Sequence, residues 1–236
     1  MIAPRCTAKN PGRCSPTISS RVDSDHGLMA DNRIGVDGLD WGKGGDLLPA
    51  VIQHWRSGAV LMLGYMNRDA LAHTQQNGKV TFWSRSKQRL WTKGETSGNF
   101  LVFKAAFADC DRDALLIHAE PQGPTCHQGT TSCFADGSAP SLTFLGELDA
   151  LIERRDSERP AGSYTTELFA SGVRRIAQKV GEEGVETALA AVAQDEQALL
   201  GESADLLFHL GVLLRARGAS LADAVSLLRE RHQRPE

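Results

Sequence analysis

The chain has 236 residues, of which 41% are hydrophobic and 23% charged, a globular composition that argues against general disorder. Its 26 basic and 29 acidic residues give a net charge of −3, so it lacks the basic excess expected of a dedicated nucleic-acid binder. No apolar run approaches the roughly 18 residues that a membrane-spanning helix needs. We therefore expect a soluble protein with neither a membrane nor a nucleic acid as its partner.

Regional differences in composition predict two domains behind a leader. Residues 36–138 carry ten basic and ten acidic residues and all four tryptophans, whereas residues 139–236 carry 11 basic and 16 acidic residues, a net charge of −5. Residues 1–35, which contain three prolines and no continuous apolar segment, are expected to be a disordered leader rather than a secretion signal. Without such a signal we expect a cytoplasmic, reducing compartment, in which cysteines act as ligands or nucleophiles before they form disulfides.

Short apolar runs punctuated by turn residues predict a mixed, mostly β domain over 36–138. We expect strands at 49–54 and 60–65, followed by a helix over 67–76 with Asn67 as its N-cap and Asn77-Gly78 as its stop.

A basic segment follows, in a strand that begins at 80–83 and runs into residues 84–93. Arg85, Lys87 and Arg89 recur with a period of two, so on an extended strand they share one face. Three cations with interleaved hydroxyls suit a phosphorylated small molecule, and the alternative is an edge strand that uses Lys and Arg to block aggregation. The polar, glycine-bounded loop 94–99 favours the binding site.

Three aspartates directly follow the next strand, which is expected at 101–108. If the chain stays extended, Asp109, Asp111 and Asp113 project to one side and Cys110 projects to the other. Three converging carboxylates need a cation, and their hard oxygen donors prefer Mg²⁺ or Ca²⁺.

The thiols of this domain predict a second metal site. Cys110, Cys126 and Cys133 lie within 24 residues, and such a group in a reducing compartment is typical of zinc. Three protein ligands leave a fourth position for water, as in a catalytic site, whereas His127 as a fourth ligand would give a structural site. Spacing alone leaves both alternatives open.

The motifs over residues 39–136 resemble phosphoribosyl-AMP cyclohydrolase. They are Val60-Leu-Met-Leu-Gly-Tyr-Met-Asn67, Phe82-Trp-Ser-Arg-Ser-Lys87, Leu90-Trp-Thr-Lys-Gly-Glu-Thr-Ser-Gly-Asn99, Asp109-Cys-Asp-Arg-Asp113, Gly123-Pro-Thr-Cys-His127 and Ser132-Cys-Phe134. Family members often have Arg where Lys87 stands, a departure that leaves the charge intact.

This resemblance implies a homodimer in which zinc is shared across the subunit interface. The implied zinc ligands are Cys110, Cys126 and Cys133, and the implied magnesium ligands are Asp109, Asp111 and Asp113. The implied reaction is addition of water at C6 of the adenine ring of phosphoribosyl-AMP, for which zinc lowers the pKa of its bound water. His127, which is next to a ligand and titrates near neutrality, is our candidate for proton transfer.

Helical periodicity dominates residues 139–236, which we expect to form an all-α domain. Helices are expected at 144–155, at 163–193, from Asp195 to Arg217, and at 221–232 with Ser220 and Asp223 as a capping box.

Acidic pairs lie on two of these helices. Glu182, Glu183 and Glu186 are on one helix, and Glu202 and Asp205 are on the next. If the chain reverses near Gln194, the pairs face each other and would hold magnesium that bridges a polyphosphate. The alternative is a solvated acidic face partnered by nearby cations, which are Arg174, Arg175 and Lys179.

Residues 142–233 resemble phosphoribosyl-ATP pyrophosphohydrolase, an all-α relative of the MazG nucleotide pyrophosphatases. The motifs are Ser163-Tyr-Thr165, Ala170-Ser-Gly172, Ile176-Ala-Gln-Lys-Val-Gly-Glu-Glu-Gly-Val-Glu-Thr-Ala188 and Glu202-Ser-Ala-Asp-Leu206. The resemblance implies magnesium pairs at Glu183/Glu186 and Glu202/Asp205, with Glu182 as an additional ligand, and a fold that dimerises to bury its core. We assign Lys179 a phosphate contact.

The order of the two resemblances is that of bifunctional enzymes for the second and third steps of histidine biosynthesis. The C-terminal domain would convert phosphoribosyl-ATP to phosphoribosyl-AMP and pyrophosphate, and the N-terminal domain would open the adenine ring. Two alternatives are a broader nucleoside-triphosphate pyrophosphatase and a non-catalytic, zinc-stapled module that binds RNA through the basic strand. The second alternative predicts salt-sensitive RNA binding without turnover.

Overall fold

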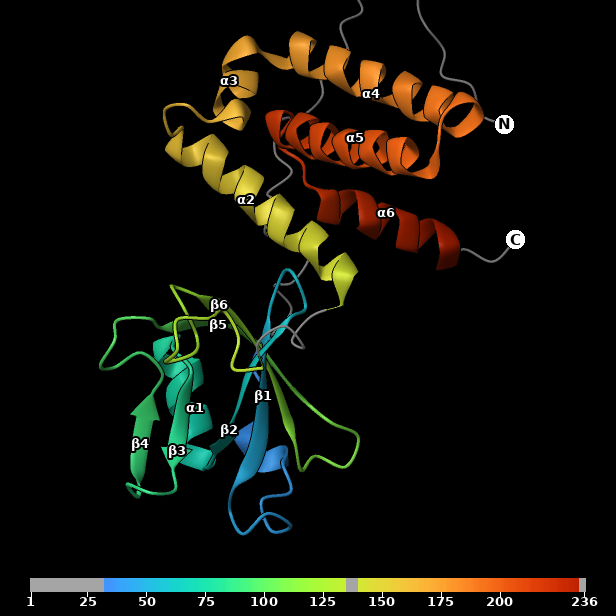
Figure 1. Ribbon diagram of the computed structural model, residues 1–236. Helices are drawn as coiled ribbons and strands as arrows, with labels where there is room; N and C mark the ends of the chain where they lie inside the picture. Colours follow the sequence, from blue (N-terminus) through green and yellow to red (C-terminus); the bar gives the residue numbers. More distant parts are fainter. Residues whose placement is uncertain (1–31, 135–139, 234–236) are drawn as a thin grey trace, which may run out of the picture.

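The structure is a computed structural model that describes residues 32–134 and 140–233. The predicted leader, residues 1–35, lies outside the described residues except for its last four. The described residues form a strand-rich region over 48–121 and an all-helical region over 141–233, which confirms the expected fold class (Figure 1).

A four-stranded sheet forms the centre of the N-terminal region. Its strands are β1 (Leu48–His54), β2 (Val60–Met66), β5 (Leu101–Ala108) and β6 (Leu115–Pro121), in the order β2-β1-β6-β5. The pair β1–β6 is parallel and the other two pairs are antiparallel. Alternate residues of β1 and β6, which include Leu48, Ile52 and Ile117, are fully buried in the core.

Helix α1 (Arg68–Asn77) and the hairpin of β3 (Thr81–Ser84) and β4 (Arg89–Thr92) complete this region. The predicted caps of α1 are confirmed. The Asn67 side chain accepts a hydrogen bond from the Ala70 N–H at 2.9 Å, and Gly78 ends the helix in the left-handed conformation at φ 67°. A short 3-10 helix, η1 (Val36–Gly38), precedes the sheet.

In two segments the backbone is not extended, so side-chain arrangements that depended on an extended strand do not form. The segment from Val80 to Lys93 does not stay extended, because the chain reverses at residues 85–88 between β3 and β4, with Gln88 at φ 50°. Strand β5 also ends at Ala108, and the aspartates follow it in a turn where Arg112 has φ 63°. The opposite-face argument for Cys110 therefore does not hold.

The helical region begins with the 3-10 helix η3 (Ser141–Thr143). Its α-helices are α2 (Phe144–Glu158), α3 (Tyr164–Ser171), α4 (Val173–Ala193), α5 (Glu196–Ala216) and α6 (Leu221–Gln233). The single helix expected over 163–193 is broken at Gly172, whose φ of 83° is left-handed. The other helices match the prediction, and the capping box of α6 is present, with the Ser220 N–H donating to Asp223 at 2.8 Å.

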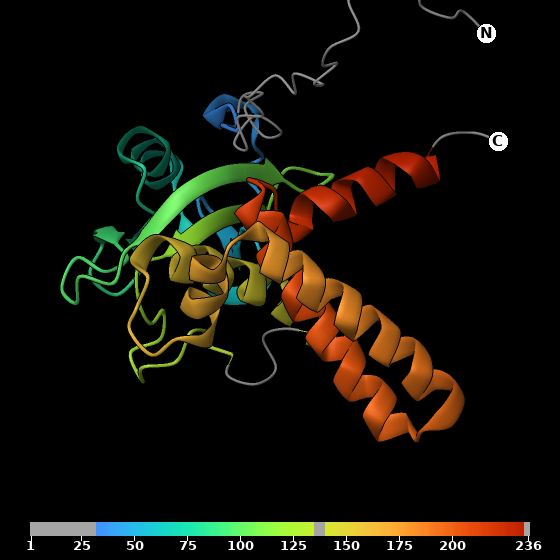
Figure 2. The ribbon, with the colours of Figure 1, turned by 90° about the horizontal axis from the view of Figure 1, so that it is seen from above.

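Helices α4 and α5 form a long antiparallel pair that extends away from the sheet (Figure 2). The chain reverses between them near Gln194, as predicted. Ile152, Leu168, Ile176 and Val212 form a small buried core where α2 and α3 meet this pair. Because that core is small, many apolar side chains of the pair remain exposed in the single chain.

Helix α5 is long and apolar enough to span a membrane when judged by length and composition only. Packing helices of water-soluble proteins pass the same test, so this criterion alone is weak. Here α5 packs along α4, and its Glu202 faces the acidic residues of that helix.

The two regions meet where the β1–β2 turn lies beside the N-terminal half of α2 (Figure 1). Gly146 of α2 approaches the turn so closely that a Cβ at this position would lie 2.9 Å from the carbonyl oxygen of Arg56. Arg56 also forms an ion pair with Glu153 of α2. This contact fixes α2 against the strand-rich region.

Candidate active sites

A pocket of about 440 Å³ in the N-terminal region contains two of the three predicted zinc ligands. Its wall comes from the end of β4, the loop 93–99 and the loop after β6. The lining residues that bear on the chemistry are Lys93, Asn99, Thr125, Cys126, His127 and Cys133. The nearby turn at 132 is held to β2, because the Cys133 N–H donates to the Leu61 carbonyl at 2.8 Å.

The two thiols of this pocket interact with each other and differ in acidity. The backbone N–H of Gln128, the Thr130 hydroxyl and Cys133 lower the pKa of Cys126. Burial and the neighbouring Cys126 raise the pKa of Cys133. Cys126 is therefore the more readily ionised of the two, and ionised thiols are the form that binds metal.

Cys110 does not line this pocket. It is exposed beyond the end of β5, and its Sγ lies 4.0 Å from Oδ1 of Asp111. Within one chain the structure thus brings together Cys126 and Cys133 but not Cys110. His127 is exposed, with its Nδ1 3.9 Å from the Cys126 sulfur.

The pocket also contains a buried polar atom that suits a bound group. Thr125 is 2% exposed, and within residues 32–134 and 140–233 its hydroxyl has no hydrogen-bond partner. A buried hydroxyl without a partner is costly unless a ligand or water satisfies it. The ammonium of the 8% exposed Lys93, which donates to the Asn99 carbonyl at 3.4 Å, adds a positive charge.

The three aspartates after β5 do converge, although in a turn and not along a strand. Their carboxylate oxygens lie within 4.8 Å of one another. Asp109 accepts hydrogen bonds from the N–H groups of Asp113 and Ala114 at 3.0 and 3.1 Å, which shapes the turn. This oxygen-rich cluster fits a hard divalent cation.

Lys43 neutralises part of this cluster, a contact that the sequence did not indicate. Its ammonium lies 2.7 Å from Asp111 and 3.3 Å from Asp113, and these contacts raise the pKa of Lys43 and lower that of Asp111. Lys43 is 68 residues before Asp111, so only the fold brings the two together.

The predicted phosphate-binding cations are divided between two places. Lys93 lines the thiol pocket, whereas Arg85 and Lys87 lie in the β3–β4 turn and Arg89 begins β4. The Arg85 guanidinium lies 3.9 Å from the centre of the Tyr65 ring, and Arg89 pairs with Glu95 of the glycine-bounded loop. Arg85, Lys87 and Arg89 therefore do not share one face of a strand.

In the helical region, Glu183, Glu186 and Glu202 place carboxylate oxygens within 4.8 Å of one another. Glu183 is only 4% exposed, and Lys179 contacts it at 2.6 Å and lowers its pKa. Burial, together with the negative charges of Glu183 and Glu202, raises the pKa of Glu186. Carboxylates this close repel one another, and a bound cation would relieve that repulsion.

The other two predicted magnesium ligands lie outside this triad. Glu182 lies 3.1 Å from Lys179 and accepts a hydrogen bond from Gln178 at 2.7 Å. This contact fits the alternative in which a carboxylate of α4 pairs with a nearby cation. Asp205 is one helical turn beyond Glu202 on α5 and is exposed in the single chain.

Behind the triad lies a histidine that the sequence analysis did not identify. His209 is 4% exposed, its Nδ1 lies 2.8 Å from the Asp205 carbonyl and 3.7 Å from Glu183, and its Nε2 lies 3.0 Å from the Tyr164 hydroxyl. The sequence signal that indicates His209 is its spacing on α5, since it is four residues after Asp205 and shares its helix face.

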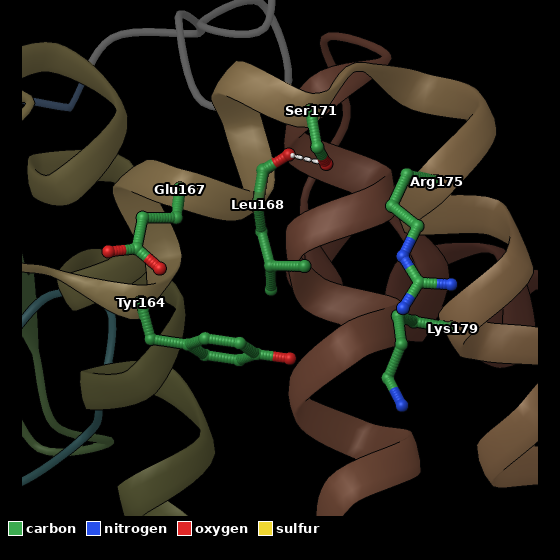
Figure 3. A pocket seen from close by; sticks show the side chains of 6 residues that line it. All are labelled: Tyr164, Glu167, Leu168, Ser171, Arg175 and Lys179. Atoms are coloured by element: carbon green, nitrogen blue, oxygen red, sulfur yellow. Dashed lines mark hydrogen bonds between the residues drawn. The ribbon is translucent and has the colours of Figure 1, made fainter.

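A second pocket, of about 240 Å³, lies beside the triad between α3 and α4 (Figure 3). It is lined by Tyr164, Glu167, Leu168, Ser171, Arg175 and Lys179. Lys179 lines this pocket and contacts Glu183 of the acidic cluster, so the two are adjacent.

The structure thus has candidate centres in two separate regions. One region carries a thiol pocket and an acidic turn, and the other carries a carboxylate triad with cations beside it. Comparison with known proteins gives the families. Residues 62–135 match the family model of phosphoribosyl-AMP cyclohydrolase, and residues 145–232 match that of phosphoribosyl-ATP pyrophosphohydrolase.

Curated relatives carry both domains in this order. The chain is 67% identical over 195 residues to the histidine biosynthesis bifunctional protein HisIE of Xanthomonas axonopodis pv. citri, covering 83% of this chain and 93% of that protein. It is 62% identical to the HisIE protein of Xylella fastidiosa Temecula1, covering 86% of this chain and 98% of the other, and 57% identical to that of Escherichia coli K12, covering 83% and 96%.

The chain belongs to the family of histidine biosynthesis bifunctional proteins. It is a bifunctional phosphoribosyl-AMP cyclohydrolase and phosphoribosyl-ATP pyrophosphohydrolase, which acts at the second and third steps of histidine biosynthesis. Both resemblances found in the sequence are confirmed, and its substrates are small molecules. Hydrolysis in the cyclohydrolase family is generally metal-dependent.

Proposed function

We propose that the two reactions use two different metal centres, zinc in the strand-rich domain and magnesium in the helical domain. The proposed domains are residues 36–138 and 139–236, preceded by a leader over 1–35. The observation that carries the proposal is the chemistry of the donors, because Cys126 and Cys133 offer soft thiolates whereas Glu183, Glu186 and Glu202 offer only hard oxygens.

For the cyclohydrolase, Cys126 and Cys133 hold zinc together with Cys110 of the partner subunit. Support for a shared site comes from Cys110, which is exposed at the protein surface and lies outside the pocket of its own chain. Bound zinc supplies a hydroxide at neutral pH by lowering the pKa of its water. His127, exposed beside Cys126, moves a proton between solvent and substrate.

The remaining residues of this domain bind substrate and a second ion. Asp109, Asp111 and Asp113 hold magnesium, which their convergence within 4.8 Å supports. Lys93 holds a substrate phosphate in the pocket, and Arg85, Lys87 and Arg89 on the adjacent hairpin attract the phosphorylated ends of phosphoribosyl-AMP.

For the pyrophosphohydrolase, Glu183, Glu186 and Glu202 hold magnesium, with Asp205 and Glu182 at the edge of the site. Magnesium held by these carboxylates would supply charge neutralisation of the triphosphate and activation of water. Lys179, which already bridges Glu182 and Glu183, contacts a phosphate of phosphoribosyl-ATP.

We further propose that the protein acts as a cytoplasmic homodimer. The supporting observation is a row of exposed apolar side chains on α4 and α5, since large exposed apolar patches mark interfaces. Those on α4 are Val185, Leu189 and Val192, and those on α5 are Leu200 and Leu207.

A reciprocal pair of variants tests the two-centre assignment. We expect Cys126→Ser to lose bound zinc and at least a hundredfold of phosphoribosyl-AMP ring opening, while pyrophosphate release stays within twofold of the wild type. Glu186→Gln should abolish pyrophosphate release and leave ring opening intact. The measurements are metal content by mass spectrometry, pyrophosphate release and ultraviolet absorbance. Loss of both activities in either folded variant would contradict independent centres.

A further inference from the structure

The pocket between α3 and α4 contains an arginine to which the proposed hydrolysis at the triad assigns no role. One wall carries Arg175 and Lys179 of α4, and the opposite wall carries the ring of Tyr164, whose hydroxyl lies 3.0 Å from Nε2 of His209 (Figure 3). Glu167 lies on the side away from both cations (Figure 3). The positive charge of the pocket is thus concentrated on the α4 wall.

The two cations differ in how closely they pair with neighbouring carboxylates. Lys179 contacts Glu183 at 2.6 Å and Glu182 at 3.1 Å, so it belongs to the acidic cluster. Arg175 approaches Glu182 only at 3.5 Å and is solvent-exposed, where a long ion pair contributes little. The guanidinium of Arg175 is therefore the group available to an incoming anion.

The spacing along α4 places Arg175 further from the triad than Lys179. Its backbone position precedes Glu183 by eight residues, about 12 Å along the helix axis, and its guanidinium reaches back to 3.5 Å from Glu182. A ligand with a second anionic group can contact Arg175 while its polyphosphate lies at the triad. Phosphoribosyl-ATP is such a molecule, because it has a triphosphate at one end and, on N1 of the adenine, a ribosyl group with its own phosphate.

We propose that the pocket binds the ribosyl phosphate on N1 of the substrate, with Arg175 as the principal phosphate ligand. This inference rests on the proposed assignment of the triad as the site of triphosphate hydrolysis. Arginine suits the role because its planar guanidinium binds phosphate through two parallel hydrogen bonds. The pocket then distinguishes phosphoribosyl-ATP from ordinary nucleoside triphosphates, which lack this phosphate.

The test uses Arg175→Gln and Arg175→Lys in the full chain, with Arg174→Gln as a matched control. Arg174 is the neighbouring exposed arginine of α4 and does not line the pocket. We expect Arg175→Gln to raise KM for phosphoribosyl-ATP at least tenfold with kcat within about twofold of the wild type. Arg175→Lys should recover only part of the loss, and Arg174→Gln should match the wild type.

Two inhibitors separate the ends of the substrate. Ribose 5-phosphate should inhibit pyrophosphate release in the wild type and lose at least tenfold of its potency in Arg175→Gln, whereas inorganic pyrophosphate should inhibit both proteins equally. An equal loss for both inhibitors, an unchanged KM, or no inhibition of the wild type by ribose 5-phosphate would overturn the proposal. Failure of the triad assignment is seen separately, as activity that survives in Glu186→Gln.

Discussion

At the scale of single residues, the acidic turn after β5 binds the ammonium of a lysine at the site where a metal ion is expected. Lys43 contacts both Asp111 and Asp113, and it neutralises carboxylates that would otherwise repel each other. The ammonium already contacts oxygen atoms that a divalent cation would bind. Lys43 therefore competes with the metal for the same oxygen atoms.

We expect Lys43→Met to bind Mg²⁺ or its analogue Mn²⁺ several-fold more tightly than the wild type, because the competing ammonium is gone. The measurement is a Mn²⁺ titration of zinc-loaded protein followed by electron paramagnetic resonance. Lys104→Met is the control, since it removes the same charge from a lysine that lies over the Trp55 ring at 5.0 Å. Equal tightening in both variants would indicate a general effect of net charge and would contradict the competition.

At the scale of elements, the close approach of β2 to β3 depends on a glycine. A Cβ added to Gly64 of β2 would overlap the ring of Phe82, which is 2% exposed and belongs to the core. The ring has no free space to move into, because it also stacks on Trp91 with 5.8 Å between ring centres. Crowding in a packed core costs about 1–3 kcal/mol.

Gly64→Ala should therefore lower the free energy of unfolding of the strand-rich domain by about 1–3 kcal/mol. The measurement is urea denaturation followed by tryptophan fluorescence, which reports this domain because all four tryptophans precede residue 92. Gly35→Ala is the control, because a Cβ there meets no atom within 4 Å and its φ of −66° is ordinary for alanine. If Gly64→Ala unfolds at the same urea concentration as the control, the contact does not constrain the packing.

Elements with local signals were predictable from the sequence, and those set by distant contacts were not. The caps of α1 at Asn67 and Gly78 and the capping box of α6 depend on residues within one turn, so their patterns suffice. The reversal at 85–88 has its positive φ at Gln88, a residue that does not mark such a turn. Strand β6 was not predicted, although its buried positions alternate.

The candidate sites divide in the same way. Cysteines and carboxylates with motif spacing were predicted because their chemistry is visible in the residue types. Lys43 and His209 were not, because each reaches its site through the tertiary fold or through a buried helix face. The convergence of Asp109, Asp111 and Asp113 was predicted for the wrong reason, since a turn and not an extended strand gathers them.

At the scale of the whole molecule, the contact between the β1–β2 turn and α2 lies outside both candidate sites, as far as residues 32–134 and 140–233 show. The β1–β2 turn contacts α2 through Arg56 and Gly146, whereas the thiol pocket is lined by β4 and the loops around it, and the triad lies on α4 and α5. His54, at the end of β1, holds this turn, because its Nδ1 accepts hydrogen bonds from the N–H groups of Ser57 at 3.0 Å and Arg56 at 3.3 Å.

His54 makes this contact sensitive to pH. Burial lowers the pKa of His54 below its usual value of 6.5, although Glu120 and Glu147 oppose the shift, and the positive charge of Arg56 adds to it. Since the pKa in the folded protein is lower than in the unfolded chain, the stabilisation by neutral His54 is present above pH 6.5. It is lost as the pH falls through the lowered pKa, when the proton on Nδ1 removes the acceptor of both hydrogen bonds.

We therefore expect the β1–β2 turn and its contact with α2 to loosen when the pH falls from about 7.5 to about 5. The measurement is hydrogen exchange of the Arg56 and Ser57 amides, corrected for the intrinsic pH dependence of exchange. His54→Gln is the matched variant, because it keeps a side-chain acceptor and does not titrate in this range. Its protection should be independent of pH, and an equal loss of protection in both proteins would show that acid acts through another group.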